Sequence, residues 1–212
     1  MRNKITLILG LFVVQLTSIA QADGYSVMKK VEDFKTKAKA VADKTTSISS
    51  DFVQKKVLSI VEEEIISKGK FLFKKENSIR WEYKDPFAYL IIINDGEIFI
   101  KDDNKENKFD MKSNNTFKGI NDMIVNSVSG NIMDDDNYTV SYFESDSYYM
   151  VQLIPKDEKM KEYMSTIQVF FDKTTHDVVK VKMLEESEDY TSIEFKNRVV
   201  NSDIADEKFT FK

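Results

Sequence analysis

The sequence predicts a mainly β domain with about ten antiparallel strands and two helices. Short runs of alternating apolar and polar residues recur from residue 50 to residue 211, and most links between these runs are short and polar. The 212 residues include only two prolines, which suits long, uninterrupted strand pairing. This regular spacing favours an antiparallel meander over a βαβ fold.

Residues 1–22 look like a secretory signal peptide rather than part of the domain. Two basic residues precede an apolar run at residues 5–14, which is shorter than the roughly 20 residues needed to span a bilayer. The small-x-small motif at residues 20–22 then marks a cleavage site. We therefore expect one exported domain at residues 23–212, which is large enough to bury a sizeable core.

Two stretches have helical spacing, residues 25–44 and, more weakly, residues 116–130, where Gly119 and several Asn and Ser residues lower the helix propensity. A sheet of about ten strands curls or closes. We expect both helices to bury their apolar stripes on its concave face. The stripes consist of Val27, Val31, Phe34, Ala38 and Val41 in the first helix and Phe117, Ile120, Met123, Ile124 and Val128 in the second.

The candidate strands follow one another closely after the first helix. The sequence Asn94-Asp95-Gly96 is a hairpin turn signal between two of them. The candidate ranges are 50–60, 65–74, 78–84, 87–94, 97–101, 105–111, 138–144, 148–154, 165–171, 178–184, 190–197 and 208–211.

The candidate strand at residues 87–94 differs from the others because it is apolar on both faces. One face holds Phe87, Tyr89, Ile91 and Ile93, and the other holds Ala88, Leu90 and Ile92. An antiparallel strand commonly turns one face to water. This strand needs cover on both sides instead. Helices on one side and an apolar ligand on the other would supply it, in either order.

The sequence offers no recognisable catalytic or metal site. With no cysteine and one histidine, His176 in a turn, it excludes thiol chemistry, Ser-His triads and ordinary zinc sites. The acidic cluster at residues 133–138 lacks the ligand spacing of a calcium loop, and no glycine-rich phosphate loop is present. The 36 acidic residues leave carboxylate pairs for glycoside hydrolysis open, but none lies in a known motif. We predict a binding protein without a cofactor, not an enzyme.

The charge balance also limits the partners. Residues 23–212 hold 29 of the 31 basic residues and all 36 acidic ones, a net charge of about −7. That charge disfavours nucleic acids and anionic lipid surfaces as main partners. No cysteine follows the signal peptide, where a bacterial lipoprotein needs one to carry its acyl chains. We expect an exported, soluble protein without a lipid anchor.

Four segments together resemble the LolA family of periplasmic lipoprotein carriers. They follow the family's order of an F-x-Q strand, a glycine-led strand, a strand ending in W-x-Y, a proline, an apolar strand running into Asp-Gly, and a closing F-x-F. The segments are SSDFVQKKV at 49–57, SKGKFLFKKENSIRWEY at 67–83, IIINDGEIFI at 91–100 after Pro86, and TSIEFKNRVVNSDIADEKFTF at 191–211.

This resemblance implies an unclosed antiparallel half-barrel of about eleven strands with a helical lid. The implied protein is a monomeric periplasmic chaperone that shelters lipoprotein acyl chains in a concave apolar cavity. It would take acylated lipoproteins from an inner-membrane ATP-driven transporter and deliver them to the outer membrane, where a receptor would accept them.

Strand parity and the stripe of the second helix predict the residues of the acyl cavity. Inverting the parity would instead turn Leu90 and Ile92 toward the ligand. At the rim, the family commonly has an arginine followed by proline six residues before the tryptophan. Here Lys75 and Glu76 occupy these positions, so the charge is kept but the forked hydrogen bonding of arginine is lost, and we expect Lys75 to control the lid differently. The predicted cavity residues are Phe71, Phe73, Trp81, Tyr83, Tyr89, Ile91, Ile93, Met123 and Ile124.

Other functions remain as alternatives. An outer-membrane receptor of the same fold would be a lipoprotein, which the missing cysteine disfavours. A periplasmic binder of another lipid or hydrophobic small molecule fits the sequence nearly as well. A hydrolase lacks a nucleophile and base, and a purely structural β-domain would have no accessible apolar cavity. Many carriers extend past the F-x-F segment, where a C-terminal tail could regulate handover to partners, whereas this sequence stops one residue after Phe211.

Overall fold

The structure, a computed structural model, describes residues 24–61, 63–75, 78–102, 105–111, 125–126 and 131–211. The expected signal peptide at residues 1–22 lies outside the described residues, as does most of the helix expected at 116–130. Residues 125–126 of that helix are described and are helical. No helix in the described ranges is both long and apolar enough to cross a membrane.

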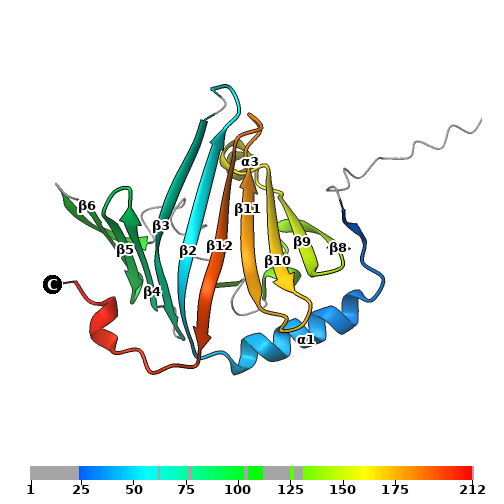
Figure 1. The fold of residues 1–212 in the computed structure, drawn as a ribbon, viewed down its shortest axis with the longest axis horizontal. Helices are drawn as coiled ribbons and strands as arrows, with labels where there is room; N and C mark the ends of the chain where they lie inside the picture. The colour runs from blue at the N-terminus through cyan, green and yellow to red at the C-terminus, as the bar shows by residue number, and fades with distance from the viewer. Residues whose placement is uncertain are drawn as a thin grey trace, which may run out of the picture.

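Twelve strands form one antiparallel sheet, in the order β1-β8-β9-β10-β11-β12-β2-β3-β4-β5-β6-β7 (Figure 1). The two strands that end this order, β1 and β7, do not pair with each other, so the described sheet is unclosed. The strands are β1 (Ser26–Val27), β2 (Ser47–Leu58), β3 (Glu63–Lys74), β4 (Ser78–Asp85), β5 (Tyr89–Asn94), β6 (Glu97–Asp102), β7 (Glu106–Asp110), β8 (Tyr138–Glu144), β9 (Tyr148–Pro155), β10 (Thr166–Asp172), β11 (Val178–Leu184) and β12 (Tyr190–Val200). The predicted fold class, a mainly β, unclosed antiparallel sheet, is confirmed.

The sheet is built from two meanders that meet at its centre. Strands β2 to β7 follow one another along one side, and β8 to β12 follow one another along the other. The long pairing of β12 with β2 joins them and places Phe195 opposite Phe52. At the β5–β6 turn, Asp95 and Gly96 have φ values of 50° and 77°, which confirms the predicted hairpin.

Helix α1 (Val31–Lys44) runs across one end of the sheet, beside β10 and β11 (Figure 1). It buries Phe34, Ala38 and Ala42, which are spaced four residues apart and therefore share one side of the helix. The face of the sheet that α1 covers is called the inner face below, and the opposite face is the outer face.

The predicted start of this helix is wrong. Residues Ser26–Val27 form β1 and pair with Glu144 and Phe143 of β8, so Val27 is exposed rather than part of the helical stripe. The helix begins only at Val31, where Glu32 and Asp33 place negative charge in its first turn. A chain that pairs with the sheet edge cannot be helical at the same residues, and the edge hydrogen bonds replace a first helical turn.

The predicted strand at residues 208–211 is also wrong. The segment forms the 3₁₀-helix η3 (Asp206–Phe209), with local hydrogen bonds from Lys208 N to Ala205 O and from Thr210 N to Glu207 O. The alternating Phe209 and Phe211 suit a strand. The segment lies over the outer face of existing strands rather than beside a free edge, so it finds no strand partner.

Two further short helices were not predicted. The α-helix α3 (Glu158–Tyr163) follows β9, with the Asp157 side chain accepting a hydrogen bond from Met160 N at its start. The 3₁₀-helix η2 (Asn131–Asp134) precedes β8 and buries Ile132 and Met133. All other candidate strands lie within a few residues of their expected bounds.

Candidate functional site

The candidate site lies on the inner face of β2 to β6 and β12, which we call the aromatic half. The antiparallel registers align inward side chains in rows across these strands. One row runs from Phe71 through Trp81 and Ile91 to Ile100, and a second runs from Phe73 through Ile79 and Ile93 to Ile98. Each row is a ladder of cross-strand pairs, so the strands present one continuous apolar surface.

Trp81 lies at the centre of this surface, among aromatic rings from three other strands. Its ring centroid is 5.1 Å from that of Phe52, 4.9 Å from that of Phe71 and 6.1 Å from that of Phe195. These distances and the tilted or edge-on angles are the arrangements that aromatic pairs favour. The four strands are therefore locked together by one aromatic cluster.

Seven of the nine residues predicted to line the cavity lie together here. Phe71, Phe73, Trp81 and Ile93 are buried, whereas the side chains of Tyr83, Tyr89 and Ile91 are half-buried at the margin of the cluster. The predicted Met123 and Ile124 lie outside the described residues. Met111 and Val125 pack against the same cluster. That these residues hold acyl chains remains a prediction.

Several residues of this surface were missed from the sequence. Strand parity alone identifies three of them. Ile79 lies two residues before Trp81 on the same strand, and Ile98 and Ile100 lie opposite the predicted Ile93 and Ile91. Phe52 and Phe195 need the strand order, because β2 and β12 become neighbours only through pairing across about 140 residues. A motif search that combined the F-x-Q strand with the aromatic cluster would have included Phe52.

Gly69 lets β3 approach β4 closely enough to build this surface. A Cβ atom at residue 69 would lie 1.9 Å from the carbonyl oxygen of Glu82 and 2.8 Å from the Phe52 ring. The register of β3 against β4 shifts between Lys68 and Gly69. Only glycine fits at such a bulge, where the backbones come this close. The Phe52 ring can therefore occupy the space above residue 69.

Two polar groups interrupt the apolar surface. The Tyr83 hydroxyl donates a hydrogen bond to Gln54 Oε1 at 2.9 Å. Burial raises the pKa of Tyr83 to about 12, with a further contribution from Tyr89, while the nearby Trp81 side chain acts in the opposite direction. The Trp81 indole N–H is buried, and no described atom lies in hydrogen-bond geometry to accept from it.

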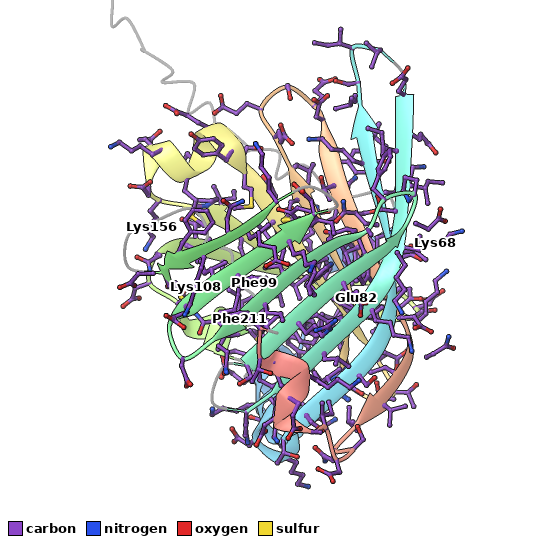
Figure 2. The ribbon with its side chains drawn as sticks, turned by 90° about the vertical axis from the view of Figure 1, so that its left-hand side faces the viewer. Lys68, Glu82, Phe99, Lys108, Lys156 and Phe211 are labelled. Atoms are coloured by element: carbon purple, nitrogen blue, oxygen red, sulfur yellow. The ribbon has the colours of Figure 1, made fainter. Side chains whose placement is uncertain are left out.

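The outer face of β5 is covered by residues 204–211, which we call the C-terminal segment. Ile204 and Phe209 bury Ile92, and Phe211 stacks on Phe99 with 4.5 Å between ring centroids. Figure 2 shows Phe99 and Phe211 side by side on the strands that face the viewer. Leu90 packs against the same cluster. This explains why β5 is apolar on both faces.

Polar contacts fasten the C-terminal segment to β3 and β4. Lys74 Nζ donates to Ile204 O at 2.9 Å and also pairs with the Asp206 carboxylate. Arg80 Nη1 donates to Lys208 O at 3.1 Å. The inverted assignment, with Leu90 and Ile92 toward a ligand, would require this segment to leave. The face of β5 that this segment leaves uncovered is therefore the one with Tyr89 and Ile91.

The other end of the inner face, on β8 to β11, is filled by α1 and η2, and we call it the helix-packed half. Phe34 from α1 lies between the rings of Tyr149 and Phe171, with centroid distances of 4.8 Å and 5.1 Å. Leu153, Val169 and Ile167 beneath it are completely buried. The chain itself therefore covers most of this half, although Tyr142 and Tyr149 at its margin are half-buried.

Glu144 secures the approach to α1. Its carboxylate accepts from Lys29 N at 3.1 Å and pairs with Lys173 Nζ at 3.0 Å. These two partners hold the pKa of Glu144 below its ordinary value, with the backbone hydrogen bond from Lys29 as the larger cause. The ionised carboxylate thus ties the segment before α1 to β8 and to the β10–β11 turn.

Lys75, the predicted rim residue, lies where β3 meets the end of α1. Its Nζ donates to the Asp43 carbonyl oxygen at 2.7 Å, and its backbone N–H donates to Thr46 O at 2.8 Å. A cation at the carboxyl end of a helix also interacts favourably with the helix dipole. Lys75 therefore connects the aromatic half to α1, and its role in lid control remains a prediction.

His176 and the acidic residues form no metal site among the described residues, where no cluster of three or more His, Cys, Asp or Glu side chains is suitably placed. His176 has a φ of 60° in the β10–β11 turn, and its ring lies 5.7 Å from that of Tyr149. Its position in this turn was predicted correctly.

Comparison with protein families gives one match. The family model described as "Outer membrane lipoprotein carrier protein LolA" matches residues 43–212. A search of curated proteins finds no match.

Solved structures resemble the fold at low sequence identity. A LolA superfamily protein from Nitrosomonas europaea is 9% identical with a TM-score of 0.45, and the alignment covers 85% of this chain and 97% of that one. An outer membrane lipoprotein-sorting protein domain from Vibrio parahaemolyticus is 9% identical with a TM-score of 0.43, covering 84% and 94%. The Mycobacterium tuberculosis lipoprotein LppX is 8% identical with a TM-score of 0.46, covering 82% and 96%.

Proposed function

Because the chain belongs to the LolA family, we propose that it is a periplasmic carrier that shelters the acyl chains of lipoproteins and moves them from the inner to the outer membrane. Proteins of this family are periplasmic carriers and not enzymes, and their fold is associated with lipid binding. In this proposal residues 1–22 direct export and are removed, and the carrier then works as a soluble monomer without a lipid anchor.

The observation that carries the proposal is the half-buried margin of the aromatic half. Tyr83, Tyr89 and Ile91 adjoin fully buried neighbours but are themselves only partly covered, so the apolar surface extends beyond what the described chain fills. In the helix-packed half, by contrast, α1 packs on the corresponding face and buries Phe34 there, although Tyr142 and Tyr149 at the margin are half-buried.

The energetics of acyl chains match such a surface. Each buried methylene is worth about 0.8 kcal/mol, so a lipoprotein with several long chains could not cross an aqueous space unprotected. A carrier must also release its cargo, and a surface with a margin of half-buried aromatic side chains can accept chains of different length. Donors and acceptors of the cargo would be an inner-membrane ATP-driven transporter and an outer-membrane receptor.

A photocrosslinking amino acid at residue 91, with residue 92 as the matched control, tests the proposal. The two neighbours lie on opposite faces of β5, and Ile92 is only 1% exposed beneath the C-terminal segment. In cells that export lipoproteins, the probe at residue 91 should capture acylated lipoprotein, and the probe at residue 92 should not. Capture at neither residue, or only at residue 92, contradicts the proposal.

Mass spectrometry of the lipids that copurify with the protein identifies the cargo. After gentle purification from cells that contain the transporter, we expect diacylated or triacylated lipoprotein. Recovery of phospholipid alone would instead favour a periplasmic binding protein for another lipid.

A further inference from the structure

Residues 63–67 of β3 form a free edge within an otherwise central strand. On one side they pair with residues 54–58 of β2. On the other side β4 pairs with β3 only as far as Lys68, because Pro86 directly follows β4 and has no N–H with which to continue the pairing. Figure 1 shows the β2–β3 hairpin extending past the end of β4. Among the described strands, the backbone of residues 63–67 therefore has one neighbour instead of two.

The free edge carries exposed apolar side chains on both faces of the sheet. Ile65 lies an even number of residues from Phe71 and so on the inner face, whereas Ile66 lies on the outer face. They are 45% and 49% exposed. Phe87, which follows the end of β4 by two residues and so lies near the start of the edge, is 74% exposed. Exposed apolar side chains gathered in one place commonly mark an interaction site.

The two end strands of the described sheet are better protected against pairing with another strand. Natural edge strands resist such pairing by being short or by carrying charged side chains. Strand β1 has two residues, and β7 carries Glu106, Lys108 and Asp110 in a run of five. Within the free edge, charge is confined to residues 63–64, and residues 65–67 are Ile-Ile-Ser. This part of β3 is therefore the described edge best suited to accept an added strand.

The free edge begins where the proposed acyl surface opens. Along β4 the inner side chains change from buried at Ile79 to half-buried at Tyr83, so the apolar surface is least covered at this end. Tyr83 lies opposite Gly69, and the next inner residue of β3 is Ser67, where the free edge starts. A bacterial lipoprotein carries its acyl chains on its first residue, a cysteine. When the chains lie on the aromatic half, the residues that follow this cysteine must therefore leave beside the free edge.

We propose that the residues following the acylated cysteine of a cargo lipoprotein add to residues 63–67 of β3 as a further antiparallel strand. This inference rests on the proposed carrier function and adds the polypeptide of the cargo to the groups that the protein recognises. The cysteine lies near Ser67 and the cargo runs toward Glu63, opposite to the direction of β3. At about 3.4 Å per residue, the edge pairs with about 17 Å of extended chain. Backbone pairing does not depend on side-chain identity, so one edge serves cargoes of different sequence.

Two matched lipopeptides test this assignment with the unaltered protein. One is dipalmitoyl-S-glyceryl-cysteine followed by six Gly and Ser residues, and the other has the same acyl chains and sequence with these six amides N-methylated. The second cannot donate backbone hydrogen bonds from these residues. We expect the first to bind about tenfold more tightly, the difference made by about two hydrogen bonds. With the first lipopeptide alone, amide hydrogen exchange should slow at residues 63–67, while exchange at residues 106–110 of β7 should stay unchanged.

Photocrosslinking amino acids at residues 64 and 66 test the direction of the added strand. Both positions lie on the outer face of the free edge, and residue 109 of β7, which is also exposed at a sheet edge, is the matched control. The probe at residue 66 should capture peptide residues closer to the cysteine than the probe at residue 64 does, and the probe at residue 109 should capture none. Capture in the reverse order overturns the antiparallel arrangement.

The remaining outcomes separate this inference from the carrier function. Equal affinity for the two lipopeptides, with unchanged exchange at residues 63–67, overturns the inference and leaves the carrier function intact, because the acyl chains still bind. Slow exchange at residues 63–67 in the free protein that becomes faster on dilution assigns the edge to a second copy of the chain and also overturns the inference. Binding of neither lipopeptide overturns both.

Discussion

The two halves of the inner face are built from the same kind of strand but are covered differently. In the helix-packed half, Phe34 of α1 inserts between Tyr149 and Phe171, and the strand residues beneath it are completely buried. In the aromatic half, Trp81 and Phe71 are buried, but Tyr89 and Ile91 at the margin stay partly exposed. The helix-packed half is thus covered by α1 and η2, although Tyr149 at its margin is half-buried, whereas the described hydrophobic residues from outside the sheet that pack on the aromatic half are Met111 and Val125.

This difference separates the residues that stabilise the fold from those available for binding within one sheet. Side chains that the chain itself covers contribute to folding, since their burial does not depend on a partner. Side chains left partly exposed contribute less to folding, because part of their apolar surface is buried only when a ligand binds. Substitutions in the two halves should therefore change two different measurements.

The largest effect is expected from Phe34→Ala in the helix-packed half. Removing a completely enclosed aromatic ring should lower the free energy of unfolding by about 3–5 kcal/mol. Urea unfolding followed by circular dichroism measures this. The half-buried Val31 on the same helix is the control, and Val31→Ala should cost about 1 kcal/mol. A loss in unfolding free energy of less than about 1 kcal/mol for Phe34→Ala would contradict the proposed difference between the two halves.

The next effect distinguishes the two faces of β5 with a pair of neighbouring substitutions. Ile92→Ala should lower the free energy of unfolding by about 3 kcal/mol, because Ile92 is buried under the C-terminal segment, and should leave lipid affinity unchanged. Ile91→Ala should cost only about 1 kcal/mol but weaken diacylglycerol binding about tenfold. Titration of both variants with the same lipid decides the matter, and equal affinities would contradict our assignment of the faces.

A somewhat smaller effect is expected from Phe209→Ala in the C-terminal segment. Phe209 is 2% exposed, but Ile204 and Phe211 keep part of the cover, so we expect a loss of about 2 kcal/mol in unfolding free energy. Proteolysis should also begin within residues 204–211. The exposed Glu207 provides the control, since Glu207→Ala should change neither stability nor the cleavage pattern. Unchanged stability in Phe209→Ala would show that the outer face needs no cover.

The smallest effect concerns how the contribution of Glu144 to stability depends on pH, since Glu144 ties the segment before α1 to the sheet. The pKa of Glu144 is lower when folded than its ordinary value near 4.5, so its stabilising contribution is fully present at neutral pH and is lost as pH falls through the folded pKa. Glu144→Gln should therefore cost about 0.5 kcal/mol at pH 7 and less at pH 3. Urea unfolding at both pH values measures the difference. A cost that stays constant between them would show that the carboxylate charge is irrelevant.

Much of the fold and site followed from period-two alternation, because it assigns a face to every strand residue without knowledge of the neighbours. Phe71, Trp81 and Ile91 were placed together in this way. The alternation could not place Phe52 and Phe195, since their contact depends on which distant strands pair. It also predicted a strand for the F-x-F end, where the side chains alternate but the segment lies over the outer face of the sheet instead of beside an edge strand. The α3 helix was missed because six residues are too few for a clear period, although Asp157 offers a capping signal.

The central pairing of β12 with β2 has a consequence for how the protein folds. Strands β2 to β6 form local hairpins, but the contact that unites the two meanders joins residues about 140 positions apart. Closing so long a loop has a high entropic cost and is slow compared with hairpin formation. A growing chain can therefore hold two separate, incomplete meanders until residues 190–200 emerge. The last step in completing the sheet is therefore expected at its centre, where β12 pairs with β2, and not at either edge.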